Sequence, residues 1–315
     1  MKTFRIALAA VPFLLTLAAS AAVTPPPAEM PRKVAGVPAP TGWAPGTGQL
    51  PVLAPVPAGR SFAFVVLGDN RGEASGKLRS VFVEMLRAMS AESPAFVLQT
   101  GDMISGYETE EGPLRRQWAA YVDGLKNSGL LVFHAPGNHD IFDAASARIY
   151  RELWGSTWYD FDYGDARFIA LDTTTLSNRL GEAQEAWLAA RLDSAAGKRV
   201  FVFFHSPPFP VDGHRGSSLD KYPADRDRLH ALFVKYKDRI KGVYSGHEHV
   251  YSFQEKDGVP YYITGGAGAH LYAKPEAGGF HHCLIVRVTA TDVKTEVRRF
   301  GEETGKPKPA PAAAR

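Results

Sequence analysis

The sequence predicts an α/β protein, built as a layered sandwich with mixed β-sheets. Apolar, strand-like runs alternate with segments of helical periodicity through much of the chain, and predicted hairpins follow them near its end. In addition, polar clusters come directly after several of the predicted strands. Alternating strands and helices followed by a run of strands are typical of an α/β sandwich, which is the class we expect here.

Strands and helices alternate over the first part of the folded region. Apolar runs predict strands at 61–67, 95–99 and 130–133, and side chains spaced along one helix face predict helices at 78–89 and 114–125. A short helix is expected at 144–153. A hairpin follows, with strands at 158–163 and 167–172 on either side of Gly164-Asp165.

The remaining elements end in a series of hairpins. A helix at 182–193 precedes a strand at 199–204, and a helix that includes Leu229 and Phe233 precedes a strand at 240–244. Further strands are predicted at 250–255, 261–264, 280–288 and 293–300. The turn at Asp257-Gly258 joins the first two of these strands.

The N-terminus has the pattern of a secretory signal peptide. Basic residues near Met1 precede an apolar run from Ile6 to Ala19, and Ala19-Ser20-Ala21 offers a cleavage site of small residues. We therefore predict a signal peptide at 1–21 and a mature protein that is secreted or periplasmic, with no transmembrane segment after cleavage. The alternative is an uncleaved N-terminal anchor.

Composition divides the rest of the chain into one folded region and two flanking segments. Residues 22–59 are dense in Pro, Ala and Gly, so we expect a semi-rigid linker there. Residues 301–315 have a similar composition and are predicted to be a disordered tail. A single domain is therefore expected at 60–300.

Charge and cysteine content exclude several classes of protein. The formal net charge is only +3, from 36 Lys+Arg against 33 Asp+Glu, so the chain has no electrostatic footprint for nucleic acid or an anionic membrane. Cys283 is the only cysteine, so no internal disulfide can form. We expect Cys283 to be a small packed residue in its strand. Composition specifies no oligomeric state.

Five polar clusters each follow a predicted strand. In open α/β sheets, ligand sites form outside the carboxyl ends of the strands, so these loops should converge on one place. The clusters are Gly68-Asp69-Asn70-Arg71, Gly101-Asp102, Gly137-Asn138-His139-Asp140, His205-Ser206-Pro207-Pro208 and Gly246-His247-Glu248-His249. One such cluster is as easily a polar turn, whereas several in succession, all with oxygen and nitrogen donors, predict a metal-centred site.

Two of the clusters have a more specific chemical meaning. His247 and His249 lie two residues apart, and on an extended segment their imidazoles would point the same way and could reach two neighbouring metals. The alternative for such a pair is a surface strand. In the third cluster, the oxygen of Asn138 can coordinate a metal and His139 can donate to a phosphoryl oxygen.

The motif order GD, GD, GNHD, H and GHxH resembles that of the calcineurin-like metallophosphoesterase superfamily, which includes purple acid phosphatases and many cyclic-nucleotide phosphodiesterases. The resemblance covers the region from about Phe62 to Phe300, in which the segments at 205–209 and 264–268 also look like this family. It implies a four-layer αββα sandwich of two mixed β-sheets flanked by helices. It also implies two divalent or mixed-valence metal ions, and this ligand chemistry fits Mn, Fe or Zn.

The resemblance assigns a role to each site residue. Asp102 resembles the carboxylate that bridges two metals. The other ligands would be Asp69 and His249 at the first metal, and Asn138, His205 and His247 at the second. His139 matches the residue that hydrogen-bonds the phosphoryl group and can protonate the leaving oxygen, with Asp140 orienting it.

The sequence departs from the family pattern at Arg71. Family members usually have a His there as a ligand of the first metal, and purple acid phosphatases instead supply a Tyr three residues after the bridging Asp, where this chain has Ser105. Tyr107 lies two residues later, so the first site should bind its metal more weakly. Arg71 has only donors and cannot bind a metal. We expect it either to clamp a substrate phosphate or to pair with a nearby carboxylate.

Two loops outside the motifs carry residues suited to a binding pocket. They contain His214-Arg215 and His270-Leu271-Tyr272. Such loops set specificity when they line a pocket, and a solvent-facing position is the equally open alternative.

These features lead us to expect an exported phosphatase or phosphodiesterase. It would hydrolyse small phosphate esters by direct attack of metal-bound hydroxide, with Arg71 and Asn138 in contact with the substrate. The alternative is a non-enzymatic or single-metal binding module whose first metal site is degenerate. A third possibility is an enzyme that holds one metal tightly and recruits the second with its substrate.

Overall fold

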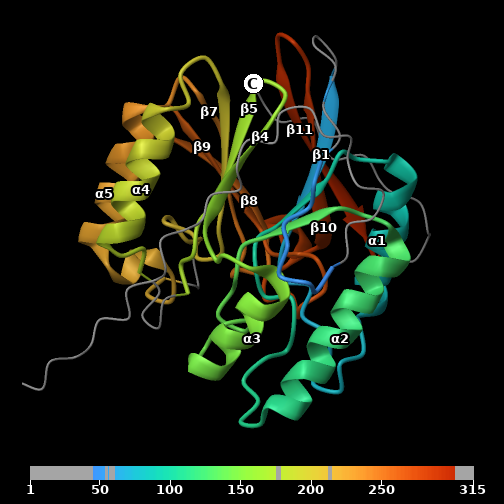
Figure 1. The fold of residues 1–315 in the computed structure, drawn as a ribbon. Coiled ribbons are helices and arrows are strands. Elements are labelled where there is room, and N and C mark those ends of the chain that lie inside the picture. The colour runs from blue at the N-terminus through green and yellow to red at the C-terminus, as the bar shows by residue number, and fades with distance from the viewer. Residues whose placement is uncertain (1–44, 54–55, 57–60, 175–178, 212–214, 302–315) are drawn as a thin grey trace, which may run out of the picture. The chain divides into compact units, whose positions relative to one another are not determined.

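The structure, a computed structural model, describes residues 45–53, 56, 61–174, 179–211 and 215–301. The predicted signal peptide and residues 302–315 of the predicted tail lie outside the described residues. Two β-sheets face each other and helices pack on their outer faces, which gives the four αββα layers that the motif order implied (Figure 1). Among the described residues, none of the helices is long and apolar enough to cross a membrane.

The first sheet is mixed, as predicted. Its strands lie in the order β11-β10-β1-β2-β3. Strands β1, β2 and β3 run parallel to one another, whereas β10 pairs antiparallel with both β1 and β11. The strands are β1 (Phe62–Leu67), β2 (Val97–Gln99), β3 (Val132–His134), β10 (His281–Val288) and β11 (Val293–Phe300).

The second sheet has the order β4-β5-β6-β7-β9-β8. Strands β5, β6, β7 and β9 run parallel, and the hairpin partners β4 and β8 close the two edges in antiparallel orientation. The strands are β4 (Tyr159–Tyr163), β5 (Ala166–Ala170), β6 (Arg199–Phe203), β7 (Ile240–Ser245), β8 (Tyr251–Lys256) and β9 (Val259–Thr264). Both predicted hairpins of this sheet are confirmed.

The helices cover the outer faces of the sheets. They are α1 (Ser80–Glu92), α2 (Glu111–Ser128), α3 (Ala144–Trp154), α4 (Glu182–Asp193) and α5 (Pro223–Lys235). Side chains of α1, α2 and α3 pack in the same cluster as the first sheet, and side chains of α4 and α5 pack with the second. Helix α2 extends beyond the predicted 114–125 at both ends, because its polar first and last turns add no apolar periodicity.

Aromatic rings fill the space between the two sheets. Phe64 of β1 stacks on Phe96 at 5.6 Å and meets Phe201 of β6 edge-on at 5.0 Å between ring centroids. Phe201 in turn stacks on Phe168 of β5 at 5.1 Å. Each of these rings is fully buried, and burial of one such side chain contributes about 1.5–3 kcal/mol. The core therefore holds the two sheets against each other.

Part of the segment predicted as a linker packs onto the folded region. Within 22–59, the structure describes residues 45–53 and 56. The backbone N–H of Gly48 donates to the carbonyl of Leu153 at 2.7 Å, and Leu50 and Leu53 pack against the aromatic core. Residues 45–53 of the predicted linker therefore contact the folded region, through scattered apolar side chains whose partners composition does not indicate.

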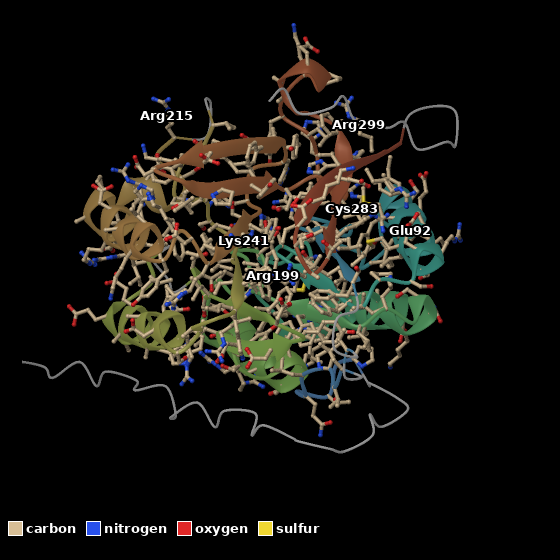
Figure 2. All side chains as sticks on the ribbon, turned by 90° about the horizontal axis from the view of Figure 1, so that it is seen from above. Glu92, Arg199, Arg215, Lys241, Cys283 and Arg299 are labelled. Atoms are coloured by element: carbon tan, nitrogen blue, oxygen red, sulfur yellow. The ribbon has the colours of Figure 1, made fainter. Side chains whose placement is uncertain are left out.

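Cys283 lies buried in β10, near Glu92 at the end of α1 (Figure 2). Burial raises the pKa of its thiol to about 12, and the nearby carboxylate of Glu92 acts in the same direction. The thiol is therefore protonated at neutral pH and is a poor nucleophile. The prediction of a packed residue is confirmed.

Candidate metal centre

The site lies at the carboxyl ends of five strands drawn from both sheets. Asp69 follows β1 and Asp102 follows β2, while Asn138 lies in the loop that leaves β3. His205 follows β6, and the segment 247–249 follows β7. The side chains of these residues meet, so the predicted convergence of the five loops is confirmed.

Backbone strain concentrates at this site. Asp69, Asp102 and His247 adopt the left-handed region with φ of 61°, 57° and 70°, a conformation that is uncommon for residues other than glycine. Each follows a glycine at the end of a strand. Strain of this kind persists only where the surroundings hold it in place, and it clusters at functional sites.

Two glycines allow the loops to approach the ligand carboxylates. A Cβ at Gly137 would lie 2.2 Å from Oδ1 of Asp102, and a Cβ at Gly246 would lie 2.3 Å from Oδ2 of Asp69. Neither position can hold a side chain without moving a carboxylate. The glycines of the GNHD and GHxH motifs are therefore needed for packing around the donors.

The first group of donors consists of Asp69, Asp102 and His249. One ligand atom from each lies within 4.8 Å of the others, and all three residues are buried. The Nε2 atom of His249 is 3.4 Å from Oδ1 of Asp69. This is the set predicted for the first metal, and the chain supplies no imidazole from position 71.

The second group consists of Asn138, His205 and His247, with Asp102 shared between the groups. Oδ1 of Asn138 lies 2.9 Å from both Nε2 of His205 and Nδ1 of His247. These two nitrogens are 3.2 Å apart, and Nε2 of His205 is 3.3 Å from Oδ1 of Asp102. The set agrees with the ligands predicted for the second metal.

Backbone carbonyls fix the proton positions of the three imidazoles. Each ring has one nitrogen within hydrogen-bond distance of a carbonyl oxygen: His205 Nδ1 at 2.9 Å from Thr100, His247 Nε2 at 3.0 Å from Ser217, and His249 Nδ1 at 2.5 Å from His270. A carbonyl only accepts, so these nitrogens carry protons and the opposite nitrogens face the donor groups.

This donor set fits a metal ion. In the second group, two imidazole lone pairs and an amide oxygen face one another at about 3 Å, an arrangement that is repulsive unless a cation or a proton lies between them. In the first group, buried carboxylates stand beside an imidazole nitrogen. Oxygen and nitrogen donors without thiolate suit Mn, Fe or Zn.

The pKa values of two ligands follow from these contacts. Burial and the neighbouring imidazole of His205 lower the pKa of His247 to about 4, so this ring is neutral at pH 7 and able to coordinate. Burial also acts on His249, but the hydrogen bond and the charge of Asp69 outweigh it and raise the pKa of His249. A metal would compete with that proton for the same nitrogen.

His139 and Arg71 lie beside the donor groups. Nδ1 of His139 lies 2.5 Å from the carbonyl of Ser105, so its Nε2 is the accepting nitrogen, and it contacts Nη1 of Arg71. The same guanidinium atom is 3.8 Å from Oδ2 of Asp102. Burial lowers the pKa of His139, and the positive charge of Arg71 adds to this effect while Asp102 opposes it.

Asp140 does not have the orienting role that the motif implied. Its carboxylate accepts hydrogen bonds from the backbone N–H groups of Asp102 at 2.8 Å, Met103 at 2.9 Å and Gly137 at 2.8 Å. The ring of His139 is held by Ser105 instead. Burial and the charge of Asp102 raise the pKa of Asp140, while the three donors oppose that rise. Asp140 therefore ties the GD loop to the GNHD loop.

The structure also corrects the geometry expected for the GHxH motif. His247 and His249 do turn toward two different donor groups, but residues 247–250 form a bend instead of an extended segment. The left-handed conformation of His247 produces this bend. The alternation of residues along a strand does not predict this bend, because the preceding glycine is the only residue type that indicates a positive φ here.

Tyr107 is a site residue that sequence reasoning set aside. It lies too far along the chain to match the metal-binding Tyr of purple acid phosphatases, but its Oη accepts a hydrogen bond from Nδ2 of Asn138 at 3.0 Å. Its ring meets the ring of His139 edge-on at 4.7 Å. The only sequence signal was an aromatic residue directly after Gly106 in a polar loop.

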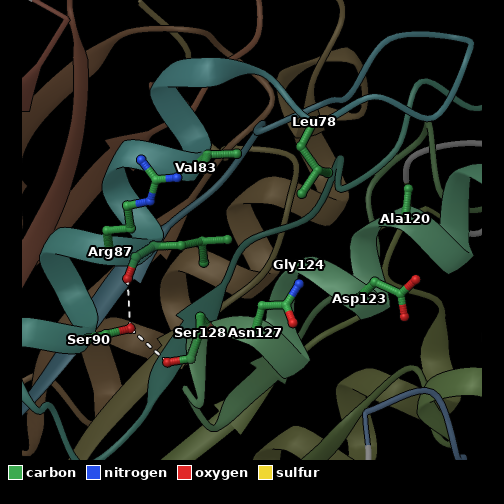
Figure 3. Close-up of a pocket in the computed structure, with 10 residues that line it drawn as sticks. Leu78, Val83, Arg87, Ser90, Ala120, Asp123, Gly124, Asn127 and Ser128 are labelled. Atoms are coloured by element: carbon green, nitrogen blue, oxygen red, sulfur yellow. Dashed lines mark hydrogen bonds between the residues drawn. The ribbon is translucent and has the colours of Figure 1, made fainter.

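A cavity elsewhere in the molecule lies outside this site. It has a volume of about 540 Å³ and is lined by residues of α1, α2 and the segment before α1, from Leu78 to Ser128 (Figure 3). Oγ of Ser90 bridges the two helices, because it lies within hydrogen-bond distance of the carbonyls of Leu86 and Ser128, at 2.8 and 2.7 Å. None of the donor residues lines this cavity.

Fold and site together define an αββα protein with two groups of potential metal ligands that share one aspartate. A sequence model of the family described as calcineurin-like phosphoesterase matches residues 62–251, and the chain belongs to this family.

Relatives and solved structures agree with this assignment. A probable glycerophosphodiester phosphodiesterase of Arcobacter nitrofigilis is 24% identical over 205 residues, which cover 59% of this chain and 71% of the relative. A dimetal phosphatase from Danio rerio superposes with a TM-score of 0.60 at 17% identity, covering 76% of this chain and 96% of the other. A purple acid phosphatase from yellow lupin has a TM-score of 0.61 at 20% identity, covering 81% and 54%. These two likenesses show the fold.

Proposed function

We propose that the chain is an exported, metal-dependent phosphoesterase that hydrolyses small phosphomonoesters or phosphodiesters. The observation that carries the proposal is the pair of donor groups that share Asp102, with His139 and Arg71 beside them. When bound, a pair of Mn, Fe or Zn ions would activate water and offset the charge of the phosphoryl group. Export rests on the N-terminal pattern alone.

The chain's own residues would bind the ester and deliver a proton. Arg71 is only partly exposed, and its guanidinium would donate two hydrogen bonds to phosphoryl oxygens. This would draw Arg71 away from Nε2 of His139, which is then free to take up a proton from water and pass it to the leaving oxygen. The carbonyl of Ser105 keeps the ring in place throughout, and Asn138 would contact the ester through its Nδ2.

Relatives inform the choice of ester. The relative from Arcobacter nitrofigilis is described as a probable glycerophosphodiester phosphodiesterase, which favours diesters, whereas the Danio rerio and lupin proteins are described as phosphatases. At identities of 17–24%, we propose activity on phosphate esters as a class. The dimetal description of the Danio rerio protein supports a pair of ions.

Hydrolysis of aryl phosphate mono- and diesters tests the proposal. We expect turnover by the mature chain with at least one of Mn, Fe, Zn or Co. Asp102→Ala and His139→Ala should each lower kcat/KM by about 100-fold or more, because they remove the shared ligand and the proton donor. Arg71→Ala should raise KM about tenfold. Asp123→Ala, on the exposed face of α2, is the control and should retain full activity.

A second candidate is a binding module with a single metal. It is favoured by Arg71, which stands where family members usually supply a ligand and lies 3.8 Å from the shared carboxylate. The amount of bound metal, measured with and without vanadate, separates the candidates. Two ions without vanadate support the enzyme, two ions only with vanadate support recruitment with substrate, and one ion in both states without turnover supports the module.

A further inference from the structure

Two of the few large apolar side chains that reach the surface do so at the candidate metal centre. In the part of the chain that the structure describes, the exposed ones are Val52, Tyr107, Phe253 and Tyr272, with 51%, 55%, 46% and 53% of their surface accessible. Tyr107 packs against His139 and Tyr272 packs against His249. A grouping of exposed aromatic residues around one site indicates a ligand contact.

Tyr107 is held rigidly despite its exposure. It has φ of 54°, a left-handed conformation that a bulky side chain rarely adopts. The preceding Gly106 packs so closely that a Cβ there would lie 1.9 Å from the carbonyl oxygen of His139. Together with the hydrogen bond from Asn138 and the edge-on contact with His139, this packing fixes the ring beside the proposed proton donor. An observed strain of this kind points to function.

Tyr272 occupies the equivalent position at the first donor group. Its ring stacks on that of His249 at 4.5 Å with an interplanar angle of 17°, while 53% of the surface of Tyr272 is accessible. The adjacent residues His270 and Leu271 line a cavity of about 670 Å³, together with Arg79 and His281. The loop therefore presents an aromatic ring next to a space that can hold an organic group.

Both rings lie one side chain away from a carboxylate of the donor groups. His139, against which Tyr107 packs, has its Nε2 3.8 Å from Oδ2 of Asp102. His249, against which Tyr272 packs, has its Nε2 3.4 Å from Oδ1 of Asp69. If metal ions bound by Asp69 and Asp102 hold the phosphoryl group of an ester, its organic group would extend past the rings of Tyr107 and Tyr272. Tyrosine suits this position, because its ring offers an apolar surface for stacking while its hydroxyl can form hydrogen bonds, as that of Tyr107 does with Asn138.

We propose that Tyr107 and Tyr272 are specificity-determining residues that bind a planar aromatic group of the ester, such as an aryl or nucleoside group. The inference rests on the proposed phosphoesterase function and adds the substrate class. An exposed aromatic ring can stack with many planar groups. The two tyrosines would therefore favour esters with a planar organic group, without discriminating among its polar substituents.

Binding of phosphonates tests the inference. Unlike esters, these compounds have no leaving group, so differences between them report only how the organic group binds. Methyl-, cyclohexyl-, phenyl- and 1-naphthylphosphonate are titrated calorimetrically into the Mn²⁺-loaded protein. Wild type should bind the phenyl compound at least about threefold more tightly than the cyclohexyl compound, because only the former is flat. Tyr107→Leu and Tyr272→Leu should each weaken the two aryl compounds about threefold to tenfold and change methylphosphonate less than about twofold.

Control variants separate stacking from loss of structure. Tyr107→Phe and Tyr272→Phe keep the rings and should retain the aryl preference, and Phe253→Leu removes an equally exposed ring of β8 and should change nothing. Equal affinity of wild type for phenyl and cyclohexyl compounds would overturn the subsite alone. A loss that is as large for methylphosphonate as for the aryl compounds would show that the tyrosines only position the histidines. If no phosphonate binds, the proposed function fails, and the subsite with it.

Discussion

Asp140 illustrates how a buried carboxylate can serve the metal centre without facing it. Three backbone N–H groups from two loops donate to its two oxygens, and all of these groups are buried. Two of the donors belong to Asp102 and Met103, so Asp140 also sets the left-handed turn that presents the shared ligand. Its role is to position the loops, whereas His139 is oriented by a carbonyl.

We therefore expect Asp140→Ala to act on stability before it acts on catalysis. The substitution leaves three buried N–H groups without a partner, and each such group costs about 1–3 kcal/mol, so the free energy of unfolding should fall by about 3 kcal/mol or more. Urea denaturation of the metal-free protein measures this. His139→Ala should cost less than about 1 kcal/mol in the same measurement. A stable Asp140→Ala protein that has lost only turnover would restore the orienting role.

At the scale of elements, the capping box of α3 anchors the exit of the GNHD loop. Oδ1 of Asp143 accepts from the backbone N–H of Ser146 at 2.7 Å, and Oγ of Ser146 accepts from the backbone N–H of Asp143 at 2.9 Å. Helix α3 begins at Ala144, four residues after Asp140. A firm start of this helix thus limits the freedom of the loop that carries His139.

Removal of this cap should have a modest, pH-dependent effect. Asp143→Ala should lower the free energy of unfolding by about 1 kcal/mol, whereas Asp143→Ser should retain most of it. The hydrogen bonds from Ser146 lower the pKa of Asp143, so the folded state favours its charged form. This contribution is present above the ordinary Asp pKa and disappears as the pH falls through the lowered value. Denaturation curves between pH 7 and pH 2 should show the wild type and Asp143→Ala converging at low pH; a constant difference would contradict the cap.

At the scale of the whole molecule, the candidate metal centre draws its residues from both sheets. Asp69, Asp102 and Asn138 leave strands of the first sheet, and His205, His247 and His249 leave strands of the second. Each donor group includes ligands from both sheets. Because the unfolded chain cannot bring these residues together, an ion that binds them stabilises the packed sandwich.

Metal removal should consequently lower the melting temperature. At a free metal concentration of about 100 times Kd, binding contributes about 2.7 kcal/mol, which corresponds to about 5 to 10 °C for a domain of this size. Thermal melts with EDTA and with Mn²⁺ measure the shift. In Asp102→Ala, which lacks the shared ligand, the shift should shrink to about 2 °C or less. Equal melting temperatures for the wild type in both conditions would show that these side chains do not bind Mn²⁺.

The sequence by itself determined the fold class and predicted a set of candidate metal ligands. The alternation of strands and helices placed the polar clusters at strand ends, and the order of those clusters predicted which donors share a metal, as with Asp102. This was possible because strand periodicity and ligand chemistry depend on residue type and spacing along the chain. Boundaries were less accurate where polar turns extend a helix, as in α2.

Only the tertiary structure decided how the site residues are held. Contacts between residues distant in the chain hold the site together. They include the carbonyls that fix each imidazole, the bonds from Asp102 and Met103 to Asp140, and the contact between Arg71 and His139. They also place the rings of Tyr107 and Tyr272. Every residue has a backbone carbonyl, so the sequence does not indicate which carbonyl accepts the hydrogen bond from a given imidazole. These contacts arise when two sheets pack and bring their strand ends together, which is why spacing alone could not reveal them.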